Sequence, residues 1–203
     1  MSVDLKSSVT LKNLMRAFAG ESQARNRYTF AAGLCKQQKL QVLGDVFQFT
    51  AGQEKEHAEI FYNHMKEAAV STVEIDGGYP VDVGNDVLVL LRSAQHNEYE
   101  EHDPVYQSFG DTAKQEGFPQ IASSFHKIAE IEQTHGNRFG AFANLLEDGK
   151  LFKADAPCAW MCLNCGYLHE GTEAPKACPV CQHDQGYFIR LDQAPFGAKT
   201  VGK

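Results

Sequence analysis

The sequence lacks a net positive charge, a long hydrophobic run and an apolar leader. Its 203 residues carry 19 lysines and arginines against 26 aspartates and glutamates, a formal net charge of −7 at pH 7. This balance disfavours a general role at nucleic acids or membranes, which require basic patches. The longest strongly apolar run, residues 87–91, is far too short to span a membrane. The first residues contain no apolar core of a secretory signal, so we expect the protein to be cytoplasmic.

Six cysteines are present, but their spacing does not indicate a disulfide framework. Four of them form two Cys-x2-Cys pairs separated by twelve residues, namely Cys162, Cys165, Cys178 and Cys181. Without a secretory signal, such spacing predicts a metal site. Of the other two cysteines, we expect Cys35 to be a buried apolar residue.

The composition changes near residue 150, which predicts two domains. Long periodic segments dominate residues 1–150, whereas prolines and glycines are interspersed with cysteines in residues 151–203. The second part has little core of its own, so a bound metal must hold it together. We therefore expect a helical domain at 1–150 and a small four-cysteine domain with a short tail at 151–203.

Four segments before residue 150 repeat apolar residues in alternating steps of three and four. Each is expected to form a helix with one buried face, which predicts an all-α four-helix bundle. Acidic and histidine residues lie on the same buried faces, where a solvated glutamate does not belong. They are Glu21 on the first segment, Glu54 and His57 on the second, Glu98 and Glu101 on the third, and Glu132 and His135 on the fourth.

Five carboxylates and two imidazoles would thus meet in the bundle core. Like charges repel strongly in a low-dielectric interior, and two metal ions would neutralise them. Carboxylate-rich ligand sets with imidazoles favour iron or manganese over zinc. The alternative is accidental spacing of surface residues, which two Glu-x-x-His motifs on matched faces make improbable.

The two helix pairs also indicate an internal duplication. Superposing Glu21 on Glu98 aligns the two Glu-x-x-His motifs and leaves Glu101 opposite Ala24, without an acidic counterpart. Pro104 lies one turn further along, where it removes a backbone donor. We expect a kink or bulge at this proline, either as part of a functional site or as a tolerated irregularity.

Some assignments stay open at this point. Tyr28 shares the face of Glu21, so its hydroxyl either holds a carboxylate ligand or bonds to the backbone. Arg25 either offsets the carboxylate charge or extends to the bundle end, and His64 is expected to pack near the site rather than bind metal. The four-cysteine spacing suits a structural zinc as well as a redox iron. Iron is favoured because a redox centre in the same chain needs an electron source.

The combined motifs resemble the rubrerythrin family over nearly the whole chain. They are AGESQARNRY at residues 19–28, the Glu-x-x-His motif at 54–57, CLNCGY at 162–167, and the Glu-Gly and Ala-Pro pairs at 170–171 and 174–175. The resemblance implies a ferritin-like bundle with two iron ions, oxo- or hydroxo-bridged when oxidised, and a rubredoxin-like domain with one iron. It also implies reduction of hydrogen peroxide to water as a defence against oxidative stress, with electrons from rubredoxin or an NAD(P)H-dependent reductase. The implied assembly is a head-to-tail homodimer.

The resemblance also assigns roles to particular residues. It implies that all seven bundle residues bind iron, and that Glu101 and His57 exchange at one iron as its redox state changes. Tyr28 and Tyr106 match family tyrosines beside the carboxylates. Two rivals are a ferritin-like ferroxidase or iron-handling protein with a structural zinc ribbon, and a non-enzymatic metal-binding protein.

Overall fold

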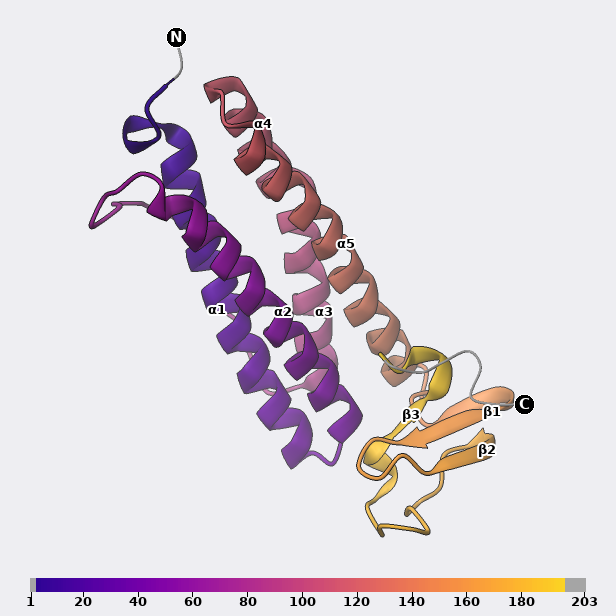
Figure 1. The fold of residues 1–203 in the computed structure, drawn as a ribbon. Coiled ribbons are helices and arrows are strands. Elements are labelled where there is room, and N and C mark those ends of the chain that lie inside the picture. Colours follow the sequence, from indigo (N-terminus) through magenta and orange to yellow (C-terminus); the bar gives the residue numbers. More distant parts are fainter. Residues whose placement is uncertain (1–2, 196–203) are drawn as a thin grey trace.

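A computed structural model describes residues 3–195, and the helical part of the chain forms a long bundle (Figure 1). Three of its elements are long helices and two are shorter helices joined by a six-residue π-helix. Their bounds are α1 Val9–Gln37, α2 Gln41–Lys66, α3 Val87–Glu100, η2 Glu101–Tyr106, α4 Gln107–Glu116 and α5 Pro119–Glu147, after a short 3-10 turn at Leu5–Ser7. This confirms the predicted all-α four-helix bundle, in which α3, η2 and α4 together make the third member.

Local sequence signals explain the main helix boundaries. Ser7 and Ser8 are both suitable caps for the first helix, and the structure uses Ser8, whose side chain accepts a hydrogen bond from the Leu11 amide. Gly117 ends α4 in a left-handed conformation with a φ of 93°. Residues 67–86 contain no helix or strand and connect the end of α2 to the start of α3 at the other end of the bundle (Figure 1). We call them the crossing segment.

The apolar core of the bundle is split into two clusters. One contains Tyr28, Phe47 and Phe139, and the other contains Phe61 and Phe125. On α1, α2, α3 and α5 the acidic and histidine candidates fall between the residues of these two clusters. A polar layer therefore crosses the middle of the bundle, enclosed by apolar side chains above and below.

The π-helix changes which side chains face the core. Helical spacing predicts Val105 and Ser108 on the buried face, but Val105 is half-buried, Ser108 is exposed, and Tyr106 is buried instead. A π-turn adds one residue to the helical turn, which shifts the register of everything after it. The irregularity that Pro104 predicts is thus confirmed, and it delivers Tyr106 to the polar layer.

The C-terminal module is a small antiparallel sheet. Its strands are β1 Lys153–Cys162, β2 Leu168–Glu173 and β3 Phe188–Arg190, in the order β2-β1-β3, with 3-10 turns at Gln185–Tyr187 and Leu191–Gln193. Trp160 is fully buried at its centre and donates a 3.0 Å hydrogen bond to the Gly171 carbonyl. The tail that the sequence places at the end of this domain lies outside the described residues from position 196 onward.

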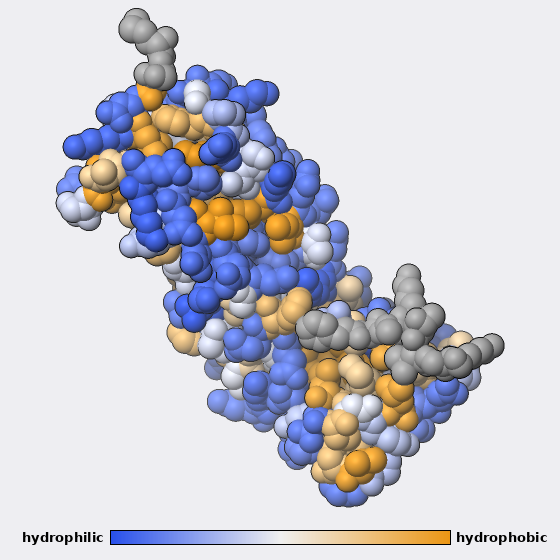
Figure 2. All heavy atoms as spheres, viewed as in Figure 1, coloured by the Kyte–Doolittle hydropathy of each residue, from blue (hydrophilic) through white to orange (hydrophobic). Residues whose placement is uncertain are grey.

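The module packs against one end of the bundle (Figure 1). Gly186 lies against the Lys39 carbonyl so closely that a Cβ there would stand 2.0 Å from the oxygen. Ile189 joins the apolar cluster of α1 and α2. Hydrophilic residues dominate the visible face of the helical part (Figure 2), and no helix within residues 3–195 is both long and apolar enough for a membrane crossing.

Candidate metal centres

Six of the seven predicted bundle ligands lie together in the polar layer. Each is at most 5% exposed, although all six are acidic or histidine residues. We call this group the carboxylate cluster, and its members are Glu21, Glu54, His57, Glu98, Glu132 and His135. Four separate helices supply it, so its assembly depends on the bundle rather than on any local motif.

The cluster divides into two overlapping sets of four ligand atoms. In each set the atoms lie within 4.8 Å of one another, and Glu54 and Glu132 belong to both sets. Glu21 and His57 complete the first set, and Glu98 and His135, their counterparts in the internal duplication, complete the second. Two shared carboxylates between two terminal pairs are the arrangement expected for a dinuclear metal site.

Each shared carboxylate turns one oxygen toward His57 and the other toward His135. Glu132 Oε1 lies 2.9 Å from His57 Nδ1, and Glu132 Oε2 lies 2.8 Å from His135 Nδ1. Glu54 repeats this at 3.3 Å and 2.9 Å. The imidazole rings stack with their centroids 5.6 Å apart and a 16° angle between their planes.

Short distances do not make these contacts hydrogen bonds. Most buried donor and acceptor atoms of the cluster have no hydrogen-bond partner among the described residues, including both carboxylate oxygens of Glu54 and Glu132 and Nδ1 of both histidines. Such orphaned polar atoms are costly in a protein interior unless something else satisfies them. Metal cations bound among these lone pairs would satisfy them, so the residues present fit two ions.

The electrostatics of the cluster point the same way. Burial raises the pKa of Glu21 and Glu98 well above the usual range, and the neighbouring carboxylates add to it. Burial opposes protonation of His135, but Glu132, Glu54 and Glu98 around the ring raise its pKa to about 12. Without metal, protons must therefore balance the negative charge that two cations would otherwise neutralise.

Two tyrosines hold the terminal glutamates of the cluster. Tyr106 Oη donates a 2.6 Å hydrogen bond to Glu21 Oε1, and Tyr28 Oη donates to Glu98 Oε1. Of the two alternatives for Tyr28, the structure therefore shows the carboxylate contact rather than a backbone bond. Burial and the adjacent carboxylates raise the pKa of both hydroxyls, so both remain protonated donors. Such contacts orient ligands around a metal.

Glu101 is the predicted ligand that lies apart from both sets of four. Its side chain is half-buried and faces the backbone of Gly20, beside the cluster. Burial raises its pKa, and the charges of Glu98, Glu132 and Glu54 raise it further. His57 is the residue that completes the first set in this structure, whereas Glu101 lies near Gly20 in the wall of a cavity.

Other polar residues lie outside the carboxylate cluster. Arg25 is exposed, which favours the alternative that it extends away from the carboxylates, and His64 packs with its Nε2 2.9 Å from Ser124 Oγ. Sequence reasoning missed Arg138, whose guanidinium donates to Thr50 Oγ1 at 2.9 Å and also to Gln53. Burial lowers the pKa of Arg138, and the negative charges of Glu98, Glu54 and Glu132 partly offset this effect. Its position one helical turn after His135 was the available signal.

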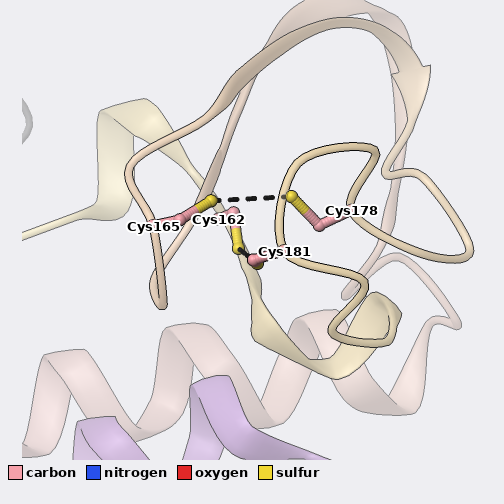
Figure 3. Close-up of side chains that lie close together, drawn as sticks. All are labelled: Cys162, Cys165, Cys178 and Cys181. Carbon is pink, nitrogen blue, oxygen red and sulfur yellow. Dashed lines mark hydrogen bonds between the residues drawn. The ribbon is translucent and has the colours of Figure 1, made fainter.

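The four predicted cysteines also come together (Figure 3). Cys162 and Cys181 have their Sγ atoms 3.7 Å apart, and Cys165 and Cys178 have theirs 3.6 Å apart. A tetrahedral ion with metal–sulfur bonds near 2.3 Å requires edges of about 3.8 Å, so these spacings suit one metal ion.

Two similar turns present these thiols. The Gly166 amide donates to the Cys162 carbonyl at 2.8 Å, and the Gln182 amide donates to the Cys178 carbonyl at 2.9 Å. Gly166 has a φ of 77°, which confirms the tight turn that the sequence predicts there. Gln182 adopts a similar φ of 61° without being glycine. The sequence gives no signal for this second turn beyond the cysteine spacing itself.

Thiol acidity differs among the metal-site cysteines, because burial raises the pKa of Cys162 to about 12, whereas Cys181 is more acidic than a free thiol. A backbone amide at His183 lowers the pKa of Cys181 to about 6, which favours the thiolate that binds metal. Cys35 is fully buried, and burial raises its pKa to about 12. The expectation of a buried apolar residue at position 35 is therefore confirmed.

Comparisons with known proteins agree with both centres. The family model described as Rubrerythrin matches residues 12–143, and the one described as Rubrerythrin, rubredoxin-like domain matches residues 160–189. Rubrerythrin of Clostridium perfringens is 44% identical over 91% of this chain and 95% of its own length. Rubrerythrins of Porphyromonas gingivalis and Nitratidesulfovibrio vulgaris are 42% and 39% identical, over 93% and 92% of this chain and 92% and 96% of their own.

Solved structures show the same fold. Nigerythrin in a mixed-valence state aligns with a TM-score of 0.61 and 27% identity, over 94% of this chain and 91% of its own. The fully reduced, all-ferrous nigerythrin aligns with a TM-score of 0.62 and 27% identity, over 94% of this chain and 88% of its own. The bundle thus fits a di-iron centre and the cysteine module fits a single metal ion. Both family models, the relatives and the site geometry agree that this chain belongs to the rubrerythrin family.

Proposed function

We propose that the protein is a non-haem di-iron peroxidase that reduces hydrogen peroxide to water and defends the cell against oxidative stress. The observation that carries the proposal is the pair of four-ligand sets that share Glu54 and Glu132. Two adjacent iron ions in this site would supply two electrons and polarise the O–O bond. The protein would supply ligand orientation, an enclosed polar layer and protons.

We assign the six residues of the carboxylate cluster and Glu101 as the iron ligands. His57 and Glu101 are proposed to exchange at the first metal position. The support is their placement, since His57 completes the first set while the Glu101 carboxylate stands beside it with no place in either set. A neutral imidazole suits ferrous iron, and a carboxylate suits ferric iron.

The surrounding residues are proposed to manage protons. Peroxide reduction consumes two electrons and two protons for each pair of water molecules formed. Glu101 carries a raised pKa at the edge of a cavity, so its carboxyl can hold a proton where the substrate enters. Tyr28 Oη donates to Glu98 Oε1 and Tyr106 Oη donates to Glu21 Oε1, so each tyrosine fixes one carboxylate and leaves its other oxygen for the metal.

Electrons are proposed to enter through one iron held by Cys162, Cys165, Cys178 and Cys181. The donor would be rubredoxin or an NAD(P)H-dependent reductase, and the domain boundary would lie at residues 150 and 151. A head-to-tail homodimer would bring this iron to a neighbouring subunit's bundle. Phe30, Val81 and Val83 are 71%, 84% and 82% exposed, and apolar side chains this exposed in one subunit support a contact with a second subunit there. A cytoplasmic setting is proposed, because its reducing conditions keep cysteines available as metal ligands.

Anaerobic re-oxidation tests this function against the iron-handling alternative. The purified protein is loaded with iron, reduced, and mixed with either stoichiometric hydrogen peroxide or air-saturated buffer. A peroxidase should re-oxidise much faster with peroxide and should contain three irons per chain. Faster oxidation by dioxygen with zinc in the cysteine site would instead favour a ferritin-like protein with a structural zinc ribbon.

A further inference from the structure

A cavity of about 510 Å³ reaches the carboxylate cluster from the side of Glu101. Helix α1 contributes Gly20 to its wall, and the π-helix contributes Glu101 and Tyr106. Residues 77–80 of the crossing segment close the outer side. The cavity therefore joins solvent to a proposed iron ligand, and a stretch of chain that belongs to no helix forms its outer wall.

Tyr79 is the large side chain at this outer wall. A Cβ on Gly20 would lie 3.8 Å from Tyr79 Cε1, 3.8 Å from Glu101 Oε1 and 4.0 Å from Tyr106 Oη. Three side chains thus converge on the bare backbone of the residue before Glu21. A Cβ on Gly77 would lie 3.2 Å from the same ring. Tyr79 is 38% exposed, so it is partly open to solvent while its ring lines the same cavity as Glu101.

The crossing segment is fixed to α1 on both sides of Tyr79. Tyr79 Oη donates a 3.1 Å hydrogen bond to the Arg16 carbonyl, and the Arg16 guanidinium bonds to Asp76 at 2.9 Å. Further along, Arg27 pairs with Asp82 at 3.2 Å, with side chains only 10% and 18% exposed. These contacts set the distance between the ring and α1, and hence the width of the entrance.

We propose that Tyr79 is a specificity-determining residue that limits which hydroperoxides reach the metal centre. This rests on the proposed peroxidase function. Hydrogen peroxide carries no substituent and passes beside the ring, whereas a bulky alkyl hydroperoxide must displace a ring that packs against two glycine positions. Reduction of either substrate takes two electrons from the metal centre and two protons. Hydrogen peroxide gives two waters, and an alkyl hydroperoxide gives one alcohol and one water.

The first test compares substrates on the iron-loaded, reduced full-length protein. Rate constants for re-oxidation are measured with hydrogen peroxide and with tert-butyl hydroperoxide. Tyr79→Ala should raise the ratio of the tert-butyl to the hydrogen peroxide rate constant by about tenfold, as removal of a steric block in a pocket does. Tyr79→Phe loses the hydrogen bond to Arg16 but keeps the ring, and the Arg16–Asp76 and Arg27–Asp82 pairs still hold the segment, so this variant should keep most of the discrimination. Glu74→Ala, an exposed truncation in the same segment, is the matched control.

A second test needs no peroxide chemistry. The protein is loaded with Co²⁺, and the loss of bundle Co²⁺ to EDTA is counted by metal analysis, while the strong thiolate–cobalt absorbance reports the cysteine site separately. Tyr79→Ala should accelerate removal, while Glu74→Ala should not. If Tyr79→Ala folds poorly, the same measurements are made on Gly20→Ala instead. Its methyl group fits at van der Waals distance and narrows the entrance, so it should slow Co²⁺ removal and lower the hydroperoxide ratio.

The outcomes separate this inference from the proposed function. Suppose that Tyr79→Ala loses Co²⁺ faster but that no peroxide oxidises the reduced protein. Tyr79 would then limit access to the metal centre as inferred, and the proposed peroxidase function would be wrong. An unchanged removal rate would overturn the entrance. Faster removal with an unchanged hydroperoxide ratio would overturn the role of Tyr79 in substrate choice.

Discussion

Glu54 and Glu132 occupy equivalent positions on α2 and α5, and each turns one carboxylate oxygen toward His57 and the other toward His135. They are also the two residues common to both sets of ligand atoms. The terminal residues, by contrast, belong to one set each. The two metal positions are therefore coupled through the shared carboxylates, and loss of a shared residue should differ in kind from loss of a terminal one.

Glu132→Gln should empty both bundle positions, whereas Glu21→Gln should weaken mainly one. The amide keeps the volume of the side chain but removes the charge and one oxygen ligand. This loss affects both metal positions for Glu132 and only one for Glu21. The measurement is Co²⁺ bound per chain by equilibrium dialysis. Three ions bound per chain in Glu132→Gln, one in the cysteine site and two in the bundle with unchanged affinity, would contradict the shared role.

Glu101→Ala should lower the rate of peroxide turnover by about a hundredfold or more while iron remains bound, because a proton donor of raised pKa is lost. The six residues of the carboxylate cluster still hold the metal. Stopped-flow kinetics and iron analysis report the two effects separately. Glu130→Ala, at an exposed position of α5, is the control. Normal turnover in Glu101→Ala would refute its proposed part in the reaction.

Metal affinity in the bundle should rise with pH. In the metal-free protein the pKa of His135 is raised to about 12, so its imidazole holds a proton at neutral pH, and burial raises the pKa of Glu21 and Glu98 in the same direction. Metal binding must displace those protons, and displacement becomes easier as the pH increases. Titration calorimetry of Co²⁺ binding in two buffers of different ionisation enthalpy measures the protons released. Binding without proton release would contradict the charge balance described for the cluster.

Tyr106→Phe should reduce the free energy of unfolding of the metal-free protein by about 1–3 kcal/mol, because the buried Glu21 carboxyl loses its hydrogen-bond donor. Tyr28→Phe should behave alike through Glu98. Denaturant unfolding of both variants gives the values. Tyr62→Phe, at a 47% exposed position, provides the comparison. Equal stability of Tyr106→Phe and Tyr62→Phe would mean that the hydroxyl does not support the cluster.

Cys178→Ser should abolish the visible absorbance of the iron in the C-terminal module without removing iron from the bundle. Three thiolates and a hydroxyl bind that iron poorly, and the two sites share no ligand. Cys35→Ser leaves all four metal-site cysteines intact and should keep the spectrum. Absorption spectra and iron counts decide the matter. Loss of bundle iron in Cys178→Ser would show that the two centres are not independent.

Sequence periodicity predicted the bundle and the burial of Glu21, Glu54, Glu98 and Glu132 because core-facing residues recur at helical spacing. The same rule failed after Glu101. A π-turn depends on backbone hydrogen bonds that no side-chain pattern records, so regular spacing placed Ser108 in the core. Tyr106 was identified through the family resemblance alone.

Other features depend on tertiary contacts that the sequence does not encode locally. Arg138 gains its place from Thr50 and Gln53 on a different helix. The position of Tyr79 depends on how the crossing segment lies across α1. The sequence predicts only that this segment cannot be helical, since two glycines and a proline flank the tyrosine.

Anomalous diffraction at the iron edge, from crystals of the iron-loaded protein, tests the central claim most directly. Two peaks are expected in the polar layer, about 3.5–4 Å apart. Each should lie beside one histidine, and both should contact Glu54 and Glu132. A third peak is expected among the four cysteines. A single peak in the bundle, or none, with the glutamates turned away from a common centre, would contradict this claim.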